Sequence, residues 1–263
     1  TTGADNYIRI YTPVSSSEVG ISQRHTGITG TGYTYKPTLS GADVGVMYVY
    51  ESYVRCEGID FDCSSASSTD EYYGVTFCPN TVVSDIRLDS SLIHGATVTG
   101  TDNGFLRGIY STNCNSTITN CIIYNMNVTN TGDTGNTGIY FYADFVEGTV
   151  HYLYNNTIYD LQGINGPTEG IIRDGWLTFV PTVYAKNNYV GNVAASGTGS
   201  ASCYSGNFAT GSTNNASSDD TASSRPGMSN GIINLTDFAD YFVSLGIVTT
   251  NLHLKTTATE LID

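Results

Sequence analysis

Two short motifs recur in phase along the chain, and this repetition constrains the fold more than any other feature. The first motif begins with glycine and continues with β-forming residues, at Gly45-Val46-Met47-Tyr48, Gly74-Val75-Thr76-Phe77, Gly108-Ile109-Tyr110-Ser111, Gly138-Ile139-Tyr140-Phe141 and Gly170-Ile171-Ile172-Arg173. The second follows each copy of the first, at Gly58-Ile59-Asp60-Phe61, Asp85-Ile86-Arg87-Leu88, Asn120-Cys121-Ile122-Ile123, Asn155-Asn156-Thr157-Ile158 and Asn187-Asn188-Tyr189-Val190. A period of about 30 residues that two motifs share indicates stacked supersecondary units.

The repeat predicts an all-β chain that winds as a parallel β-helix solenoid with coils of about 30 residues. Each coil contributes short strands, and each strand pairs with its equivalent in the next coil. Inward positions therefore stack on like positions, and the second motif supplies one apolar column of Phe61, Leu88, Ile123, Ile158 and Val190. Because a single coil cannot bury this face, stacking is what creates the core.

A polar column is expected at the corner between strands. Asn120, Asn155 and Asn187 share one phase of the repeat, and Asp85 holds the same phase one coil earlier. Asparagine tolerates left-handed backbone conformations and hydrogen-bonds turn backbone, so these residues predict a structural ladder. The functional alternative is a row of polar ligand-binding groups.

The repeat also suggests how the chain is divided. We expect a single β-helix domain over 1–263, with first coils or a cap in 1–44, regular coils in 45–200, and an irregular last coil and cap in 201–263. Residues 237–246 are expected to form one helical turn and 251–254 a closing strand, because solenoids need atypical ends. Polar stretches between the repeats, such as 64–73 and 163–169, are expected to be loops that carry any binding function.

Charge excludes several classes of partner. The net charge is −14 with only 10 Lys and Arg, so the basic footprint that nucleic acid requires is missing. No run of about 18 apolar residues is present, which predicts that no segment spans a membrane. An acidic chain of this kind is expected to remain soluble outside the cell.

Cysteine usage bears on the compartment. Six cysteines, at 56, 63, 78, 114, 121 and 203, form no C-x-x-C pair, and the four histidines are scattered, so zinc is poorly supported. With five glycosylation sequons they fit an extracellular, cell-surface or virion location. Cys78 and Cys114 fall near one phase and are the candidate disulfide, with a stack of free buried thiols as the alternative.

The glycine-led strands and asparagine corners resemble right-handed parallel β-helix proteins of the pectin-lyase-like class. The segments Asp5-Asn6-Tyr7-Ile8-Arg9-Ile10 and Asn251-Leu252-His253-Leu254-Lys255 resemble parts of uncharacterised bacterial and phage surface proteins of that class. The resemblance covers most of the chain and is specific for the fold. It implies a function among pectate lyases, polygalacturonases, phage tailspikes, head decorations and adhesins, and fold alone does not select among these.

Evidence for catalysis is thin in the sequence. The carboxylate and histidine motifs of polygalacturonases are absent apart from one pair, Asp219-Asp220, in a serine-rich stretch. Carboxylates on two consecutive coils predict a calcium site of the lyase type, at Asp60, Asp62, Asp85 and Asp89. The competing interpretation is an outward polar face on which Arg55 and Arg87 pair with these acids.

A glycan contact is predicted around the single tryptophan. Trp176 lies in Arg173-Asp174-Gly175-Trp176, and with the 20 tyrosines it offers aromatic faces with polar rims for sugar rings. The same aromatic residues would otherwise be core or ladder residues.

The sequence as a whole favours a non-catalytic extracellular or virion surface protein with a structural, decoration or adhesion role. Its expected partners are surface glycans or a virion or cell-surface scaffold, with a homo-oligomer as a further option and no cofactor beyond calcium. The alternative is a polysaccharide lyase or glycoside hydrolase.

Overall fold

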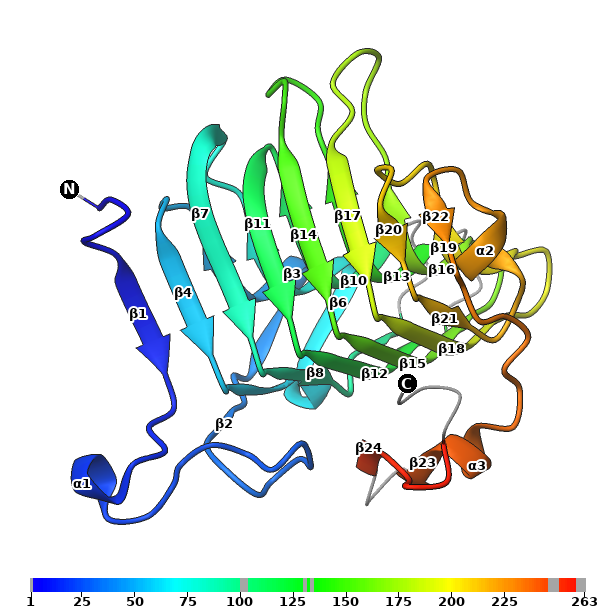
Figure 1. The fold of residues 1–263 in the computed structure, drawn as a ribbon. Helices are drawn as coiled ribbons and strands as arrows, with labels where there is room; N and C mark the ends of the chain where they lie inside the picture. Colours follow the sequence, from blue (N-terminus) through cyan, green and yellow to red (C-terminus); the bar gives the residue numbers. More distant parts are fainter. Residues whose placement is uncertain (1, 100–103, 130–131, 133–134, 246–250, 259–263) are drawn as a thin grey trace.

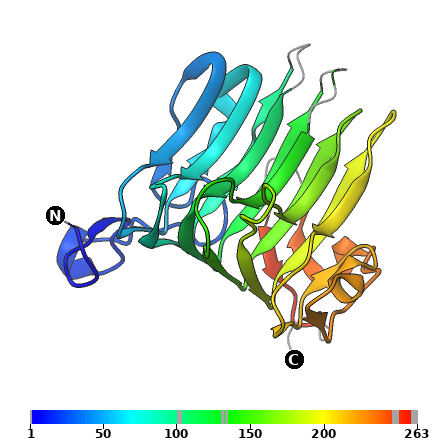
Figure 2. The same cartoon turned by 90° about the horizontal axis from the view of Figure 1, so that it is seen from above.

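The chain folds as a parallel β-solenoid whose coils lie about 32 residues apart. The computed structural model describes residues 2–99, 104–129, 132, 135–245 and 251–258. Each coil passes through three sheets in turn, and Figure 1 shows the strands of successive coils side by side. Viewed from above, the coils follow one another from the N-terminal to the C-terminal side (Figure 2). No helix in the described ranges is long and apolar enough to cross a membrane.

Three parallel sheets form the walls. The first contains β1 (Ile8–Tyr11), β4 (Val54–Glu57), β7 (Thr81–Asp89), β11 (Cys114–Thr119), β14 (Val150–Tyr154), β17 (Thr182–Lys186), β20 (Ser212–Thr213) and β22 (Met228–Ser229). The second contains β2 (Thr34–Tyr35), β5 (Asp60–Asp62), β8 (Leu92–His94), β12 (Ile122–Val128), β15 (Thr157–Gly163), β18 (Tyr189–Ala195) and β21 (Ala216–Ser217), with β9 (Thr97–Val98) beside β12. The third contains β3 (Leu39–Val49), β6 (Ala66–Phe77), β10 (Phe105–Thr112), β13 (Gly135–Tyr142), β16 (Thr168–Arg173) and β19 (Ala201–Ser205).

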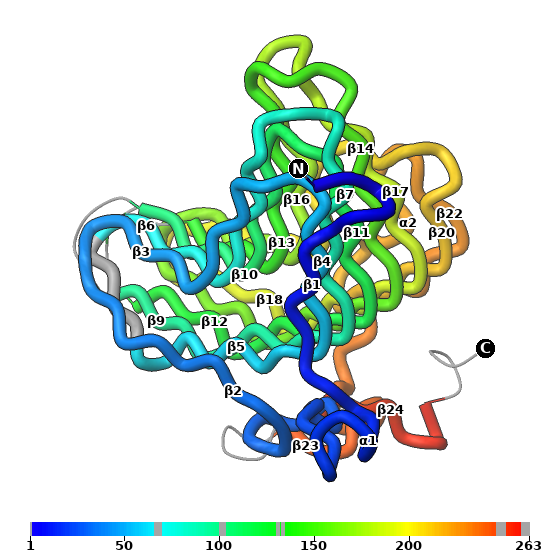
Figure 3. Tube along the Cα trace, turned by 90° about the vertical axis from the view of Figure 1, so that its left-hand side faces the viewer, coloured from blue at the N-terminus to red at the C-terminus, as the bar shows by residue number. Residues whose placement is uncertain are grey.

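Short helical turns interrupt this pattern. They are α1 (Ser16–Val19), η1 (Cys63–Ser65), α2 (Thr221–Ser224) and α3 (Phe238–Tyr241). The tube in Figure 3, seen along the stack, shows that the three sheets enclose one interior. The stretch 64–73, expected to be a loop, is mostly strand, because β6 begins at Ala66 and pairs with β3 along much of its length.

Apolar side chains stack in columns inside the solenoid, with one correction to the predicted column. Phe61, Ile93, Ile123, Ile158 and Val190 are register partners in the second sheet and are almost fully buried. The predicted member Leu88 instead lies in the first sheet, between Cys56 and Ile118. Leu88 precedes the corner between the sheets and Ile93 follows it, so in this coil the second motif lies one sheet before its equivalents in the later coils.

A column of glycines lines the third sheet where it faces the second. Gly74, Gly108, Gly138 and Gly170 occupy equivalent places in successive strands. A β-carbon on Gly138 would lie 2.6 Å from the Gly170 carbonyl oxygen and 2.8 Å from Cγ2 of Ile158. The earliest copy of the glycine motif, at Gly45, is out of register by one residue, because Gly45 pairs with Tyr73 rather than with Gly74.

Asparagines form an outer row at the corner between the first and second sheets. Asn120, Asn155 and Asn187 have positive φ angles of 55°, 57° and 55°. Nδ2 of Asn155 donates to Oδ1 of Asn120 at 3.3 Å, and Nδ2 of Asn187 donates to Oδ1 of Asn155 at 3.2 Å. Asp85 is not part of this row. The acid that Asn120 contacts is Asp89, at 2.8 Å, because the corner follows the end of β7.

A second, inner row lies one residue further along. Asn156, Asn188 and Asn215 are 1%, 1% and 0% exposed. The Asn188 side chain accepts the Asn156 backbone N–H at 3.0 Å and donates to the Leu153 carbonyl at 2.9 Å. These bonds satisfy backbone groups that the corner would otherwise leave unpaired inside the protein. Asn215, which heads one of the glycosylation sequons, is therefore enclosed by protein.

The C-terminal segment lies along the side of the solenoid. It contains α3 and the antiparallel pair β23 (Phe242–Ser244) and β24 (Asn251–Leu254), so both a helical turn and a strand are present near the predicted places. Phe242 stacks edge-on against Tyr189 at 5.0 Å, and Tyr159, Tyr189 and Phe242 belong to one buried cluster. The segment thus covers the outer face of the second sheet (Figure 1).

A polar network is enclosed in the core. Nδ1 of His151 lies 2.8 Å from Oγ of Ser116, which lies 3.0 Å from Oγ of Ser111. The imidazole is fully buried and packs on Phe141 at 4.5 Å between ring centroids. Burial disfavours the charged ring and lowers the pKa of His151 to about 3.

The glycine column predicts a position-specific cost. Gly138→Ala places a methyl group against backbone and Ile158, so we expect the free energy of unfolding in urea to fall by about 1–3 kcal/mol. Gly41→Ala is the control, because its β-carbon would lie 3.7 Å from the nearest atom, Cγ2 of Val44. Equal losses in the two variants would contradict a steric role for the column.

The buried imidazole predicts acid sensitivity. The pKa of His151 is about 3 in the folded state against about 6.5 when unfolded, so between these values the unfolded chain binds the extra proton. Stability is therefore unaffected by this group above pH 6.5 and falls as the pH drops below it, by about 2 kcal/mol at pH 5. Urea denaturation of wild type and His151→Gln from pH 7 to pH 5 measures this. The variant should show the smaller fall, and parallel curves would exclude His151 as the cause.

Candidate functional site

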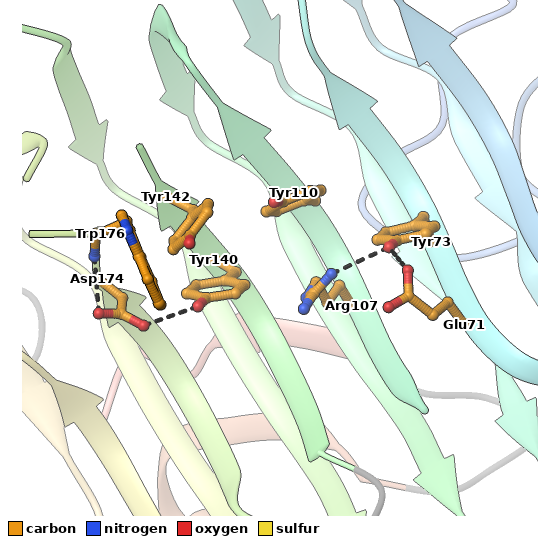
Figure 4. A pocket seen from close by; sticks show the side chains of 9 residues that line it. Glu71, Tyr73, Arg107, Tyr110, Tyr140, Tyr142, Asp174 and Trp176 are labelled. Atoms are coloured by element: carbon orange, nitrogen blue, oxygen red, sulfur yellow. Dashed lines mark hydrogen bonds between the residues drawn. The ribbon is translucent and has the colours of Figure 1, made fainter. Parts of the chain in front are cut away.

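An aromatic groove runs across the outer face of the third sheet. It crosses β6, β10 and β13 and reaches the segment after β16, and it encloses about 600 Å³. The residues of this aromatic groove are Glu71, Tyr73, Arg107, Tyr110, Tyr140, Tyr142, Asp174, Gly175 and Trp176. Figure 4 shows their side chains projecting from the same face of neighbouring strands.

The tyrosine rings stack because the register of the coils brings them together. Tyr110 and Tyr140 are register partners on β10 and β13, and each is flanked by buried residues that point inward. Their ring centroids lie 5.6 Å apart, and Tyr73 lies at the same distance from Tyr110 on the other side. The result is a row of phenol rings parallel to the solenoid axis.

Arg107 lies beneath this row and is held mainly by ring faces. The residue is only 7% exposed, and its guanidinium carbon lies 4.6 Å from the Tyr110 ring centroid and 4.8 Å from that of Tyr140. Nη1 donates to the hydroxyl of Tyr73 at 3.1 Å. Nε is buried without a hydrogen-bond partner, and none of the ion pairs among the described residues includes Arg107.

Carboxylates mark the two ends of the groove. Glu71 accepts the hydroxyl of Tyr73 at one end. Asp174 accepts the hydroxyl of Tyr140 at 2.9 Å and the backbone N–H of Gly175 at 2.7 Å at the other. Three strand spacings separate β6 from β16, so the backbones of these two residues lie about 14 Å apart or more.

The groove can bind and orient a ligand, and its ionisable groups are poorly placed for acid–base chemistry. Burial raises the pKa of Tyr73, Tyr110 and Tyr140 above the usual value, so the phenols stay protonated. The separation of Glu71 and Asp174 exceeds the roughly 5–9.5 Å at which paired carboxylates cleave a glycosidic bond.

The turn after β16 presents apolar side chains beside the groove. Trp176 is 59% exposed and Leu177 is 80% exposed. A bridge between Trp176 and Phe179 closes the turn, with the Phe179 N–H donating to the Trp176 carbonyl at 3.0 Å. Leu177 has a φ of 55°, a left-handed conformation that costs a leucine energy and that no burial offsets.

The structure places the predicted glycan-contact residues as follows. Trp176 and Asp174 line the groove, whereas Arg173 turns away and donates Nε to the Pro181 carbonyl at 2.7 Å. Sequence reasoning missed the other members, above all Arg107 and the tyrosine row. Tyr110 and Tyr140 hold the same place in the glycine motif, and that shared phase was the signal for them.

The acids predicted to bind calcium do not gather in one place. Asp60 is fully buried and lies 2.7 Å from Nε2 of His94, and its other oxygen accepts the hydroxyls of Thr29 and Thr34. Burial alone would raise the pKa of Asp60, but these hydrogen bonds and the His94 contact lower it overall. The cluster ties the N-terminal loop to the second sheet.

The other three predicted calcium ligands have separate partners. Asp62 pairs with Lys36 at 2.8 Å, and Asp89 accepts the Asn120 side chain. Asp85 lies between Arg55 and Arg87 at 3.0 and 2.7 Å, which is the outward Arg–Asp arrangement named as the alternative. Within the described ranges, no three His, Cys, Asp or Glu side chains are grouped to hold a metal.

Within the Asp219-Asp220 pair, Asp219 has a structural role. Oδ2 of Asp219 accepts the Cys203 backbone N–H at 2.8 Å, and Oδ1 accepts the Thr221 backbone N–H at 2.9 Å. These bonds hold the start of α2 against β19.

The predicted disulfide between Cys78 and Cys114 is wrong, because all six cysteines are free thiols. Cys114 pairs in register with Thr81, while Cys78 follows Phe77, whose partner is Ser111. Asn80 and Asn113 are both left-handed and precede the paired residues Thr81 and Cys114, and the register then shifts between Cys114 and Ser116, so similar distances from the second motif do not bring the two cysteines together. Burial raises the pKa of Cys114 to about 12, which leaves this thiol unreactive.

A smaller hollow of about 300 Å³ lies on the first sheet, between Ser84, Asn115, Thr117 and Tyr152. Tyr152 is 41% exposed and stacks on Tyr184 at 5.4 Å. Tyr152 is thus an exposed tyrosine, stacked on a neighbouring ring, that lies away from the aromatic groove.

Comparison of the sequence with protein-family models, with curated proteins and with solved structures finds no match. The geometry of the groove therefore carries the functional argument.

The turn beside the groove generates a prediction. Leu177→Asn replaces a residue strained at positive φ by one that adopts this conformation readily, so the free energy of unfolding should rise by about 1 kcal/mol. The equivalent change at Val83, which is 64% exposed in β7 and has no such strain, is the control and should not stabilise the protein. A loss of stability at position 177 would show that the turn does not strain leucine.

Proposed function

We propose that this protein is a non-catalytic surface β-solenoid that binds a polysaccharide in the aromatic groove, outside the cell or on a virion. In this proposal it is a right-handed β-helix of the pectin-lyase-like class, of the bacterial or phage surface type. The observation that carries the proposal is the row of tyrosine rings at Tyr73, Tyr110 and Tyr140, which ends at the exposed Trp176.

The chemistry of the groove matches sugar rings. A sugar presents an apolar face of C–H groups and a rim of hydroxyls, and aromatic rings with polar edges complement both. Trp176 supplies an exposed ring face, the stacked tyrosines supply ring edges and hydroxyls, and the carboxylates of Glu71 and Asp174 supply hydrogen-bond acceptors at the ends. A concave site of several hundred cubic ångströms with a few convergent polar groups is typical of ligand binding.

Binding is favoured over cleavage by the state and spacing of the ionisable groups. The phenols have raised pKa values and are poor bases at neutral pH. The carboxylates of Glu71 and Asp174 are too far apart to act on one glycosidic bond. Arg55 and Arg87, the nearest arginines to the predicted calcium acids, are both engaged by Asp85.

The surface location is supported by charge and architecture. A net charge of −14 with 10 basic residues suits a protein that stays soluble without binding nucleic acid or anionic lipid. A rigid stack of coils also presents a long, even face, which suits attachment to extended polymers.

The proposal predicts that ring truncation weakens glycan binding. Wild type is applied to an array of bacterial and host polysaccharides, and the strongest ligand is titrated by calorimetry. Trp176→Ala and Tyr110→Ala should each weaken binding about tenfold, because each removes about 1.4 kcal/mol of ring contact. The same titration scored for new reducing or unsaturated ends should stay negative.

The matched control is Tyr152→Ala, which removes an exposed, stacked tyrosine from the first sheet and should leave binding unchanged. Failure of wild type to bind any glycan, or equal weakening by all three variants, would refute the proposal. Turnover of a bound polymer would favour the lyase or hydrolase alternative instead.

A further inference from the structure

One end of the aromatic groove combines three aromatic rings with a carboxylate. Its residues are Asp174, Trp176, Tyr140 and Tyr142, and Figure 4 shows them grouped at the opposite end from Glu71. Trp176 is 59% exposed, so a face of its indole remains open to a ligand. The Tyr140 and Tyr142 rings lie 5.8 Å apart and are tilted by 43°. Because ring faces attract positive charge, rings grouped beside a carboxylate suit a cation.

Asp174 is ordered by hydrogen bonds and forms no ion pair with a described residue. Its two oxygens accept the Tyr140 hydroxyl at 2.9 Å and the Gly175 backbone N–H at 2.7 Å. None of the ion pairs in the described part of the chain includes Asp174. Arg173 precedes it but donates Nε to the carbonyl of Pro181. The carboxylate is therefore held in place while its charge remains available to a ligand.

The positive charge of Arg107 is offset on the other side of the groove. Nη1 of Arg107 donates to the Tyr73 hydroxyl at 3.1 Å, and this hydroxyl donates to Glu71. Two hydrogen bonds that meet at one oxygen place the guanidinium and the Glu71 carboxylate within about 6 Å of each other. Because the two charges are opposite, each reduces the effect of the other at the Trp176 end.

The acids outweigh Arg107 at the Trp176 end. Burial raises the pKa of the Tyr142 phenol, and the charges of Asp144 and Asp174 raise it further, each by more than Arg107 lowers it. Burial also raises the pKa of Tyr140, and there too the charge of Asp174 has a larger effect than that of Arg107. Both phenols thus lie in a negative potential, which favours a cationic ligand.

We propose that the Trp176 end of the aromatic groove binds the ammonium group of an amino sugar, in a polysaccharide that carries unacetylated amines. Asp174 supplies the opposite charge, and the rings of Trp176 and Tyr142 contact the cation. This inference rests on the proposed function and specifies the class of polysaccharide.

Three hexamers with the same β-linked backbone test this preference. They consist of glucosamine, N-acetylglucosamine and glucose, which carry an ammonium, an acetamide and a hydroxyl group on the same carbon. Because Trp176 is the only tryptophan, its fluorescence reports directly on this end of the groove. In titrations at about pH 6.5 and physiological salt, the glucosamine hexamer should bind about tenfold more tightly than either neutral hexamer. Equal binding of the three would overturn the inference and leave the proposed function standing.

The charge of the ligand can also be removed by pH. Raising the pH from about 6.5 to about 9 deprotonates the amine, whose pKa is close to that of an α-amino group. Tyr140 and Tyr142 stay protonated, because burial raises the pKa of both. The glucosamine hexamer should therefore lose its advantage over the glucose hexamer at the higher pH. An advantage that persists would exclude ammonium as the recognised group.

Variants separate Asp174 from the overall charge of the protein, since a net charge of −14 attracts any polycation at long range. Asp174→Asn removes one charge but keeps an acceptor for the Tyr140 hydroxyl, so the preference for the glucosamine hexamer should fall about fivefold or more. Asp220→Asn removes the same charge before α2, where this side chain makes no capping hydrogen bond, and should leave the preference unchanged. Equal effects of the two variants would overturn the assignment to the groove.

Further measurements keep the outcomes distinct. Thermal unfolding of each variant checks that the fold is retained. Trp176→Leu, followed by calorimetry, tests the ring independently of Asp174 and should also reduce the preference, whereas an unchanged preference would contradict a contact between the indole and the cation. If no hexamer binds while a glycan of the array does, this inference falls alone. If wild type binds no glycan at all, the proposed function falls with it.

Discussion

The rest of the structure depends on in-register parallel pairing between coils. Each backbone strand bonds to its equivalent one coil away, at about 4.8 Å, so every position in the repeat stacks on the same position in its neighbours. A residue type at a given position of the repeat must therefore pack against the same position in the neighbouring coils, and not only within its own coil. This constraint explains why the glycines, the buried isoleucines and the corner asparagines each recur, since a single misfit would disturb the strands on both sides.

The same constraint decides how much could be predicted. The coil length and the corner at Asn120, Asn155 and Asn187 follow from spacing, because left-handed backbone geometry selects the same residue type in each coil. Leu88 and Asp85 were misplaced because two sheets separated by a short corner both carry alternating apolar residues. Spacing alone does not reveal on which side of the corner a copy of the motif begins.

The aromatic groove shows a second limit of sequence reasoning. Tyr110 and Tyr140 share a phase and could be placed together, but Tyr73 occupies the register row of Arg107 instead. Its ring reaches Tyr110 diagonally across the sheet, at 5.6 Å. A contact of this kind depends on side-chain direction and length, which periodicity does not encode. The Cys78–Cys114 pairing fails for a different local reason, because β7 has three more residues between Thr81 and Ile86 than β11 has between Cys114 and Ser116, and periodicity does not signal this shift of register.

The position of the groove moves the expected place of a binding function from the loops to the strands. Loops between coils were the expected place for function, yet most of the groove residues lie on β6, β10 and β13, with only its Asp174–Trp176 end on a turn. Rings held by strand register lose little freedom when a ligand arrives, so less of the contact energy is spent on ordering the site. A row of rings that repeats with the coils also runs along the solenoid axis, so a polymer lying on it meets equivalent contacts at successive strands. Under the proposed function, a stack of repeats that folds by matching like with like presents a repeating surface to a repeating ligand.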